Sequence, residues 1–255
     1  MTKRVRAFLA LFALGFIGIP SVLPEIASMA ADYGVSPMLL IISELISLSL
    51  LLGITVAIGM YAAPRVGFRS LVYEAIIDGT PVLSQLKSGA RLAVPVGIGV
   101  GVVLIILEAV MTDSVAASVA DPTPLEVLAT APFRFLYGGV TEELMLRWGV
   151  MSLLAFGLWW VGLKIGMGRE DQPGPKVVWG AIVLAAGLFA IGHLPMAQTM
   201  FGTLTGRLLA YILLGNAIGG IVFGWFFWRY NLETAMITHA CAHIPIVVIG
   251  MLLAL

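Results

Sequence analysis

The pattern of apolar and polar positions divides the chain into seven long apolar segments separated by more polar connections. The segments are residues 7–24, 37–61, 92–111, 133–163, 177–193, 206–228 and 232–254. A helix of about 20 residues crosses a hydrocarbon core roughly 30 Å thick, and every segment is near or above that length. The pattern therefore predicts an all-α, polytopic membrane helix bundle of seven or eight transmembrane helices in a single domain, residues 1–255.

The basic residues predict the orientation of this bundle, because Lys and Arg are enriched in cytoplasmic connections. With a cytoplasmic N-terminus, eleven of the fourteen Lys and Arg fall on the cytoplasmic side. The exceptions are Arg134, Arg147 and Arg207. We therefore expect a multi-pass protein of the cell (cytoplasmic) membrane, with its N-terminus in the cytoplasm and its C-terminus outside.

Composition agrees with a membrane protein. The chain of 255 residues is 60% hydrophobic and 11% charged, whereas soluble domains contain roughly 25% charged residues. The formal net charge of zero argues against a nucleic-acid partner.

Lys3, Arg4 and Arg6 precede an apolar run as in a signal peptide, and residues 28–30 would serve as its cleavage site. We expect an uncleaved first helix, because the remaining segments need no separate export signal; cleavage is the alternative.

Two longer connections carry structure of their own. Residues 62–91 are basic and half apolar, which predicts a helix lying at the cytoplasmic interface. Residues 112–131 contain Thr123, Pro124 and Glu126 in the pattern of a capping box with proline at the first helical position. A short helix is therefore expected to start at Pro124.

Other small or polar residues within the segments have structural explanations. The sixth segment contains Gly215, Gly219, Gly220 and Gly224, which favour close helix packing in lipid. Glu44 and Glu108 are isolated acids in the second and third segments. We expect both to be protonated or hydrogen-bonded to a neighbouring helix rather than catalytic.

The strongest indication of chemistry is a pair of adjacent acids, Glu142 and Glu143, inside the fourth segment. An ionised side chain at bilayer depth costs at least about 2.5–3.5 kcal/mol, so an intramembrane carboxylate is a functional candidate by default. Neighbouring side chains project about 100° apart around a helix, so the two acids have different surroundings.

Arg147 follows Glu143 by four residues, the spacing at which side chains meet on one helix face, and predicts an ion pair. Glu142 is then left without a local partner. A carboxyl group removed from water keeps its proton more readily, which suits a general base or acid near neutral pH. The alternative is an architectural ion pair beside a protonated, inert Glu142.

All three histidines lie in the C-terminal half of the chain. His239 and His243 are four residues apart on one helix face, a spacing that can chelate a metal ion, with His193 or Glu142 as a further ligand. Helix lengths place the histidines at different depths. His239 lies about 10 Å from the cytoplasmic start of its helix, whereas His193 lies at the far end of the segment 177–193 from the cytoplasmic side. Tilt, or a buried turn near Asn231, would bring them together.

In this order the motifs resemble those of the CPBP family, the CAAX proteases and bacteriocin-processing enzymes of the Abi type. The motif residues are Glu142, Glu143 and Arg147, then Phe189 and His193, then His239 and His243. The resemblance covers roughly residues 125–250 and implies a catalytic core in residues 124–255, preceded by motif-free helices in residues 1–123. It further implies an intramembrane endopeptidase with its site between the fourth, fifth and seventh helices.

The resemblance also implies roles for these side chains. Glu142 and His193 would activate the water that attacks the peptide bond, and Glu143 with Arg147 would position the helix. His239 and His243 would complete the site or stabilise the oxyanion. Family members often carry Asn at the last position, where this chain has His243. An amide donates a hydrogen bond without titrating, so two mechanisms stay open: glutamate catalysis that requires no cofactor, or a divalent metal, zinc, held by Glu142 and the three histidines.

The expected partners are the lipid bilayer and a peptide or membrane-protein substrate, and the resemblance adds prenylated C-terminal peptides. Two other classes of function stay open. A proton-coupled transporter or channel would use the same residues to relay protons, although the sequence shows no internal repeat of the kind many transporters carry. A non-catalytic scaffold or immunity protein would use the fold for binding alone.

Overall fold

The computed structural model describes residues 1–30, 34–111, 123–166 and 171–255. In these ranges seven helical spans are long and apolar enough to cross a membrane, and every regular element is a helix. The spans are Lys3–Ser28, Pro37–Val66, Val82–Met111, Pro124–Lys164, Pro175–Phe201, Gly206–Arg229 and Leu232–Leu253. Each predicted segment corresponds to one span, which confirms the all-α polytopic fold.

Several spans consist of more than one helix. In chain order the elements are α1 (Lys3–Phe16), α2 (Ile19–Ser28), α3 (Pro37–Ala62), η1 (Ala63–Val66), α4 (Leu71–Ile77), α5 (Val82–Met111), α6 (Pro124–Ala129), η3 (Phe133–Glu142), η4 (Leu144–Met151), α7 (Ser152–Lys164), α8 (Pro175–Gly192), α9 (Leu194–Phe201), α10 (Gly206–Arg229) and α11 (Leu232–Leu253). The capping box predicted at Thr123 is present and begins α6.

Two predicted boundaries are wrong. The third span begins at Val82 instead of residue 92, because Lys87 and Arg91 continue the helix and such long side chains reach polar surroundings from a membrane helix end. The fifth span does not end at His193: after a break at that residue α9 begins, with Pro195 in its first turn. Proline is compatible with a first helical turn because that turn leaves its amides unbonded. His193 therefore lies at a break inside the span.

The span that carries the acid pair is wound differently from the others. From Phe133 to Met151 its stretches η3 and η4 are π-helical. Hydrogen bonds in such turns reach five residues along the chain instead of four, and π-helical turns are frequent at functional sites. The sequence does not predict this winding, because a segment that is apolar on most faces carries no stripe that reports the number of residues per turn.

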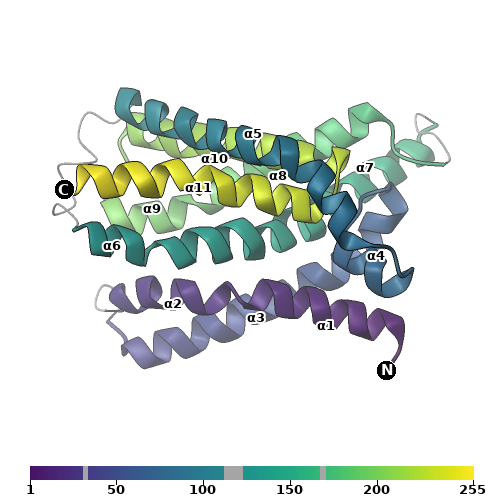
Figure 1. Ribbon diagram of the computed structural model, residues 1–255, viewed down its shortest axis with the longest axis horizontal. Helices are drawn as coiled ribbons and strands as arrows, with labels where there is room; N and C mark the ends of the chain where they lie inside the picture. The colour runs from purple at the N-terminus through teal and green to yellow at the C-terminus, as the bar shows by residue number, and fades with distance from the viewer. Residues whose placement is uncertain (31–33, 112–122, 167–170) are drawn as a thin grey trace.

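The first three helices form one layer of the bundle, at the bottom of Figure 1. There α1, α2 and α3 pack on one another and meet the fourth span through η3 and η4. A buried hydrogen bond fixes this contact, since Thr141 Oγ1 of η3 donates to the carbonyl oxygen of Gly15 at 2.6 Å. The approach is close: a methyl group at Gly18 would collide with Thr141 and with the backbone of Leu136.

The remaining helices pack through small residues. α11 lies along α5, and α10 lies along α8. Gly97 and Gly101 of α5 press against the backbone of α11, where a side chain would meet the carbonyl oxygens of Thr238 and Ala242. On α10, a methyl group at Gly220 would lie 2.8 Å from Ala186 of α8. This agrees with the packing role predicted for the α10 glycines, whereas the equivalent glycines of α5 were not singled out from the sequence.

The turn between α10 and α11 is buried beneath α4. The Glu233 carboxylate accepts hydrogen bonds from Ser70 Oγ at 2.6 Å and from the backbone amides of Leu71 at 2.8 Å and Val72 at 3.0 Å. It thereby satisfies the free amides at the start of α4. Asn231 caps α11 by accepting from the amide of Thr234 at 2.8 Å. The last helix therefore starts at a turn that α4 covers.

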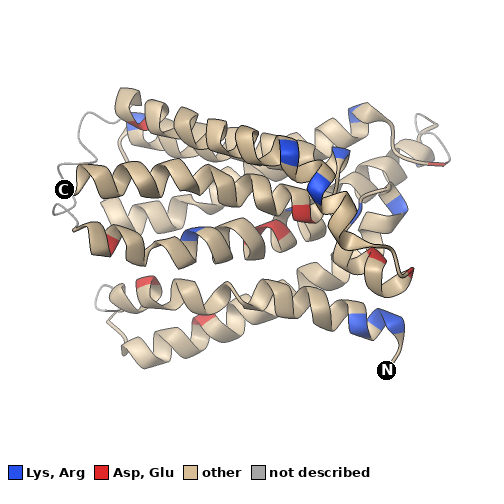
Figure 2. Cartoon of the chain, in the orientation of Figure 1, with Lys and Arg blue, Asp and Glu red and all other residues tan. Residues whose placement is uncertain are grey.

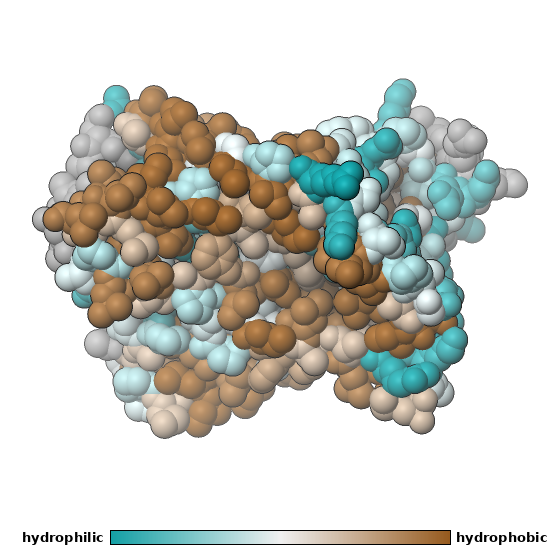
Figure 3. All heavy atoms as spheres, viewed as in Figure 1, coloured by the Kyte–Doolittle hydropathy of each residue, from teal (hydrophilic) through white to brown (hydrophobic). Residues whose placement is uncertain are grey.

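Charge gathers at one end of the bundle, where α1 begins (Figure 2). We call it the basic end; the helix ends that meet there carry Lys3, Arg4, Arg6, Arg65, Arg69, Lys87, Arg91, Lys164, Lys176 and Arg229. Figure 3 shows hydrophobic side chains over much of the viewed face and hydrophilic ones gathered toward the basic end. This distribution fits a membrane-spanning bundle, while the cytoplasmic location of the basic end stays a prediction.

Candidate functional site

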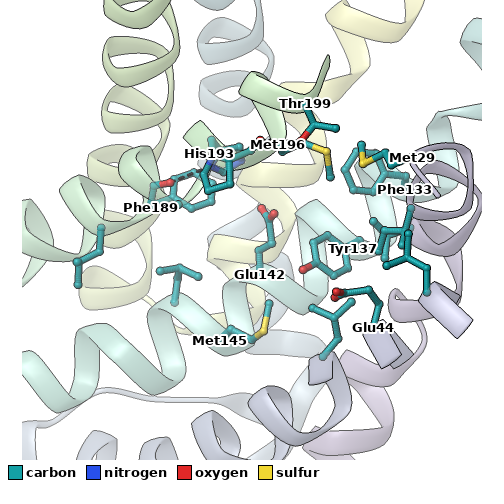
Figure 4. A pocket seen from close by; sticks show the side chains of 18 residues that line it. Met29, Glu44, Phe133, Tyr137, Glu142, Met145, Phe189, His193, Met196 and Thr199 are labelled. Carbon is teal, nitrogen blue, oxygen red and sulfur yellow. Dashed lines mark hydrogen bonds between the residues drawn. The ribbon is translucent and has the colours of Figure 1, made fainter. Parts of the chain in front are cut away.

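A cavity of about 560 Å³ lies between α2 and α3 on one side and η3, η4, α8 and α9 on the other. Most of the residues that line it are apolar. In Figure 4 the Glu142 carboxyl group points from η3 into this space, toward the side where His193 and Phe189 lie. The cavity therefore brings together an acid and an imidazole that are far apart in the sequence, and both were singled out from their motifs.

The hydrogen bonding of His193 determines which ring nitrogen is free. Its Nδ1 lies 2.8 Å from the carbonyl oxygen of Phe189, one turn earlier in α8. A carbonyl oxygen only accepts, so this bond requires the proton on Nδ1 and leaves Nε2 of a neutral ring as a hydrogen-bond acceptor. The break between α8 and α9 at His193 thus holds the ring in one orientation at the cavity wall.

Glu143 faces away from the cavity and is fully buried. Its Oε1 lies 2.9 Å from Arg147 Nη1 and 2.8 Å from His239 Nδ1. The Glu143–Arg147 pair confirms the prediction from their spacing. The contact with His239 was not predicted, because it depends on how α11 packs against η3. One carboxylate oxygen therefore joins the acid motif to the last helix.

Aromatic rings surround the Arg147 guanidinium. Its central carbon lies 4.9 Å from the centre of the Phe189 ring and 5.4 Å from that of Phe223, within the range of cation–π attraction. Nη2 also donates to the carbonyl oxygen of Gly220 at 3.3 Å. The His239 ring stacks on Phe223 with 4.3 Å between ring centres. These contacts hold the charged group in a fixed position inside the bundle.

The two imidazoles of α11 lie over a glycine of η3. The ring centres of His239 and His243 are 5.1 Å apart. A methyl group built on Gly138 would lie 3.0 Å from Nε2 of His243 and 3.7 Å from Nε2 of His239. Gly138 precedes Glu142 by four residues, so both nitrogens lie about one helical turn from the acid. His243 Nδ1 is buried without a hydrogen-bond partner in the described residues.

The predicted site residues therefore form two adjacent groups. Glu142 and His193 line the cavity, whereas Glu143, Arg147, His239 and His243 lie beside it. Phe189 links the groups, since its ring centre is 4.6 Å from that of His193 and 6.1 Å from that of His239. His239 thus lies next to the acid motif, 2.8 Å from Glu143, although its position seven residues into the last helix had placed it near the cytoplasmic side.

The position of the cavity differs from the one that the resemblance implies. Residues of the first, second, fourth and fifth spans line the cavity, and no described residue of α11 does. The physical reason is the close contact between α11 and η3. Gly138 and Gly139 let the last helix approach until a methyl group on Gly139 would lie 3.0 Å from Ala240, so little space remains between the two helices.

The sequence did not single out one polar residue of the cavity, Tyr137, and it indicated a structural role for another, Glu44. Tyr137 precedes Glu142 by five residues and stacks on Phe133 with 5.7 Å between ring centres. Glu44 of α3 lies on the opposite wall, although the sequence indicated a structural acid. A lone acid or tyrosine in an apolar segment has no spacing signal that would associate it with a distant motif. Glu108, the other isolated acid, accepts a hydrogen bond from the Tyr211 hydroxyl at 3.3 Å, as predicted for a helix-bonding residue.

The arrangement of the donor side chains bears on metal binding. Within the described ranges, His, Cys, Asp and Glu side chains do not gather into a group of three or more that could hold a metal ion. Glu142, His193, His239 and His243 therefore do not form a ready ligand set in this conformation. Dependence on zinc stays a prediction.

The fold and the cavity define a polytopic helical membrane protein with an internal site built from carboxylates and imidazoles. Residues 124–244, which contain all of the motif residues, match the family model described as Type II CAAX prenyl endopeptidase Rce1-like. The match covers slightly less than half of the chain and supports an intramembrane endopeptidase of the CAAX type. No curated protein and no solved structure gives a significant match to the chain.

Proposed function

We propose that the chain hydrolyses a peptide bond in or near the bilayer, with Glu142 as the general base and His193 as its partner. One observation carries the proposal: the Glu142 carboxyl group, which forms no ion pair with another described residue, and the His193 ring line the same cavity. A base must lie within hydrogen-bond reach of the proton that it removes, directly or through one water. A water held between Glu142 and Nε2 of His193 meets that condition.

The proposed reaction follows the usual balance of peptide hydrolysis. Glu142 takes a proton from the water, and the water oxygen forms a bond to the carbonyl carbon of the substrate. The carbonyl oxygen gains the negative charge of a tetrahedral intermediate. The carbon–nitrogen bond then breaks as the protonated Glu142 returns its proton to the leaving nitrogen, which restores the carboxylate. His193 holds the water through its Nε2 acceptor during this sequence.

The second group of residues supports this chemistry in the proposal. Glu143 stabilises a positive charge on Arg147 and fixes the His239 ring through Nδ1. The bond to Glu143 places the His239 proton on Nδ1, so Nε2 of a neutral His239 is an acceptor, whereas His243, whose Nδ1 has no partner among the described residues, can carry its proton on Nε2 and donate to an oxyanion. His239 and His243 are absent from the cavity lining, so an oxyanion role for either residue requires a conformation in which its ring reaches the cavity.

The proposed substrate is the C-terminal segment of a prenylated peptide or membrane protein. The family name supports this class, and the cavity wall suits it because apolar side chains predominate. The apolar lining residues include Val22, Ile26, Met29, Leu40, Leu48, Phe133, Met145 and Leu188. Such a wall accepts lipid chains and apolar side chains without leaving polar groups unpaired.

The test is cleavage of farnesylated CAAX peptides by the purified protein in lipid vesicles. Glu142→Gln and His193→Ala are expected to lower kcat/KM at least about a hundredfold. Glu126→Gln is a matched control, because Gln also serves in a capping box, and it should cleave like the wild type. Full cleavage by both site variants would remove the mechanism. Glu142-dependent proton flux without cleavage would favour the transporter alternative.

Metal dependence is measured in the same preparations. Zinc content is compared between the wild type, His239→Ala and His243→Ala. In the proposed glutamate mechanism, active protein contains no stoichiometric zinc. One zinc per active chain, lost in both variants together with activity, would replace that mechanism by a metal-dependent one.

A further inference from the structure

One wall of the cavity comes from outside the stretch that matches the family. Six lining residues come from α2, from the residue directly after it and from α3: Val22, Ile26, Met29, Leu40, Glu44 and Leu48. The matched stretch begins only at residue 124. The reacting groups and the facing wall therefore belong to different parts of the chain. A substrate in the cavity would contact both.

Among the described residues of this wall, Glu44 is the only one with an ionisable side chain. It is half-buried, and its five companions on the wall are apolar. No ion pair joins it to another described residue, and the cavity lining contains no Lys or Arg. An unpaired carboxylate at membrane depth is costly, and acids in such positions commonly face a cavity in which a ligand or ion compensates the charge. Packing alone does not account for Glu44.

Figure 4 shows what Glu44 faces. Its carboxyl group lies near the hydroxyl end of Tyr137, with Glu142 farther along the same cavity. A phenol supplies one hydrogen-bond donor and leaves the charge of a carboxylate in place. The polar groups on this side of the cavity are thus two acids and one hydroxyl, without a cation. A positively charged group in the cavity would relieve the mutual repulsion of the acids and pair with Glu44.

We propose that Glu44 selects substrates that carry a cationic side chain close to the cleaved bond. The inference rests on the proposed function, because it assumes that the substrate segment occupies this cavity. The ammonium group of a lysine, on its flexible apolar stem, fits a wall that is apolar except at one point. The α2–α3 wall then determines which segment is cleaved, while residues of the matched stretch determine the reaction.

The test compares peptides that differ only by one charge. Farnesylated peptides carry either lysine or norleucine, its neutral isostere, at each position in turn on both sides of the cleaved bond. Wild-type kcat/KM is expected to favour lysine by about tenfold at one position, the value of a charge-assisted hydrogen bond. Binding of the same pairs to Glu142→Gln protein measures the preference without cleavage.

Variants assign the preference to Glu44. In Glu44→Gln the lysine-to-norleucine ratio should fall to about one, and Glu44→Lys should instead prefer a peptide with glutamate at that position. The control is Glu25→Gln, an acid of α2 that does not line the cavity, and it should keep the wild-type ratio. If Glu44 instead donates a hydrogen bond to a neutral group of the substrate, none of these proteins should prefer lysine, and the inference is overturned.

The outcomes separate this inference from the proposed function. Cleavage of neutral peptides with a ratio of one at every position overturns the role of Glu44 and leaves the peptidase standing. If lysine peptides bind in a Glu44-dependent manner but no protein cleaves them, the role of Glu44 in recognition is supported and the proposed peptidase function is wrong. A lysine preference that survives in Glu44→Gln also overturns the inference.

Discussion

At the scale of single residues, Glu143 Oε1 is the point at which the acid motif, Arg147 and His239 meet. All three side chains are almost completely buried. Removing one partner of a buried ion pair leaves an uncompensated charge, which costs more than losing the pair as a whole. The stability of the protein should therefore depend on this arrangement much more than on Glu142, which has no ion-pair partner among the described residues.

Arg147→Met is expected to lower the free energy of unfolding by about 3–5 kcal/mol, because it leaves the Glu143 carboxylate buried without its guanidinium. The double variant Glu143→Gln with Arg147→Met should recover part of that loss. Reversible unfolding in mixed detergent micelles measures both. Lys87→Met, at an exposed position of α5, is the control and should change stability by no more than about 0.5 kcal/mol. Equal losses in the single and double variants would contradict the explanation.

Gly138 tests whether the imidazoles of α11 take part in the reaction. A methyl group there would lie 3.0 Å from His243 Nε2, so the ring must shift by a few tenths of an ångström. Gly138→Ala should reduce kcat about tenfold, because small misplacements of reacting groups are costly. Gly187→Ala on α8, where a methyl group meets open space, should leave kcat unchanged. A Gly138→Ala protein of normal kcat would argue against a role for His239 and His243.

The sequence predicted some of these residues and not others, for a physical reason. Glu143 and Arg147 are four residues apart, so helix geometry alone predicts their contact. The bond between Glu143 and His239 joins residues 96 positions apart and depends on the packing of two helices. Glu44 reaches the cavity only through the placement of α3. Contacts of that kind leave no mark in local spacing.

At the scale of elements, the spans were predictable and their ends were less so. Hydrophobic length identifies a membrane helix because the bilayer sets that length. The break at His193 and the π-helical winding of η3 and η4 depend on neighbouring helices. The same holds for α4, a helix of seven residues within residues 62–91, where an interfacial helix was expected.

The contact between α5 and α11 provides a test at this scale. Gly97→Ala places a methyl group against the Thr238 carbonyl oxygen and should destabilise the protein by about 1–3 kcal/mol through overpacking. Gly99→Ala, on the same helix but facing open space, should be neutral or stabilising by up to about 1 kcal/mol, because alanine favours the helix. Thermal unfolding in detergent compares the two. Equal effects would mean that α5 and α11 are not in close contact.

At the scale of the whole molecule, the seven candidate spans of the described residues predict that the two termini lie on opposite sides of a membrane. The basic residues predict that the N-terminal side is cytoplasmic. The chain has a single cysteine, Cys241, so a Cys241→Ala background accepts new cysteines at exposed positions. Asp78 near the basic end and Leu255 at the other end are both exposed.

In that background, Asp78→Cys should react with a membrane-impermeant maleimide only in inverted or permeabilised vesicles. Leu255→Cys should react in intact cells, after removal of any outer barrier. The labelled fraction at each site is measured by the mass shift of the protein. The reverse pattern would invert the orientation, and labelling of both sites from one side would contradict an odd number of spans.

The division of the cavity between two parts of the chain has an evolutionary consequence. The side chains proposed to perform the reaction lie within residues 124–244, whereas one wall is built by helices before residue 67. Mutations in those early helices can change what fits inside without disturbing the acids and imidazoles. Relatives that differ mainly in their first two membrane crossings should therefore share one hydrolytic reaction while processing different proteins.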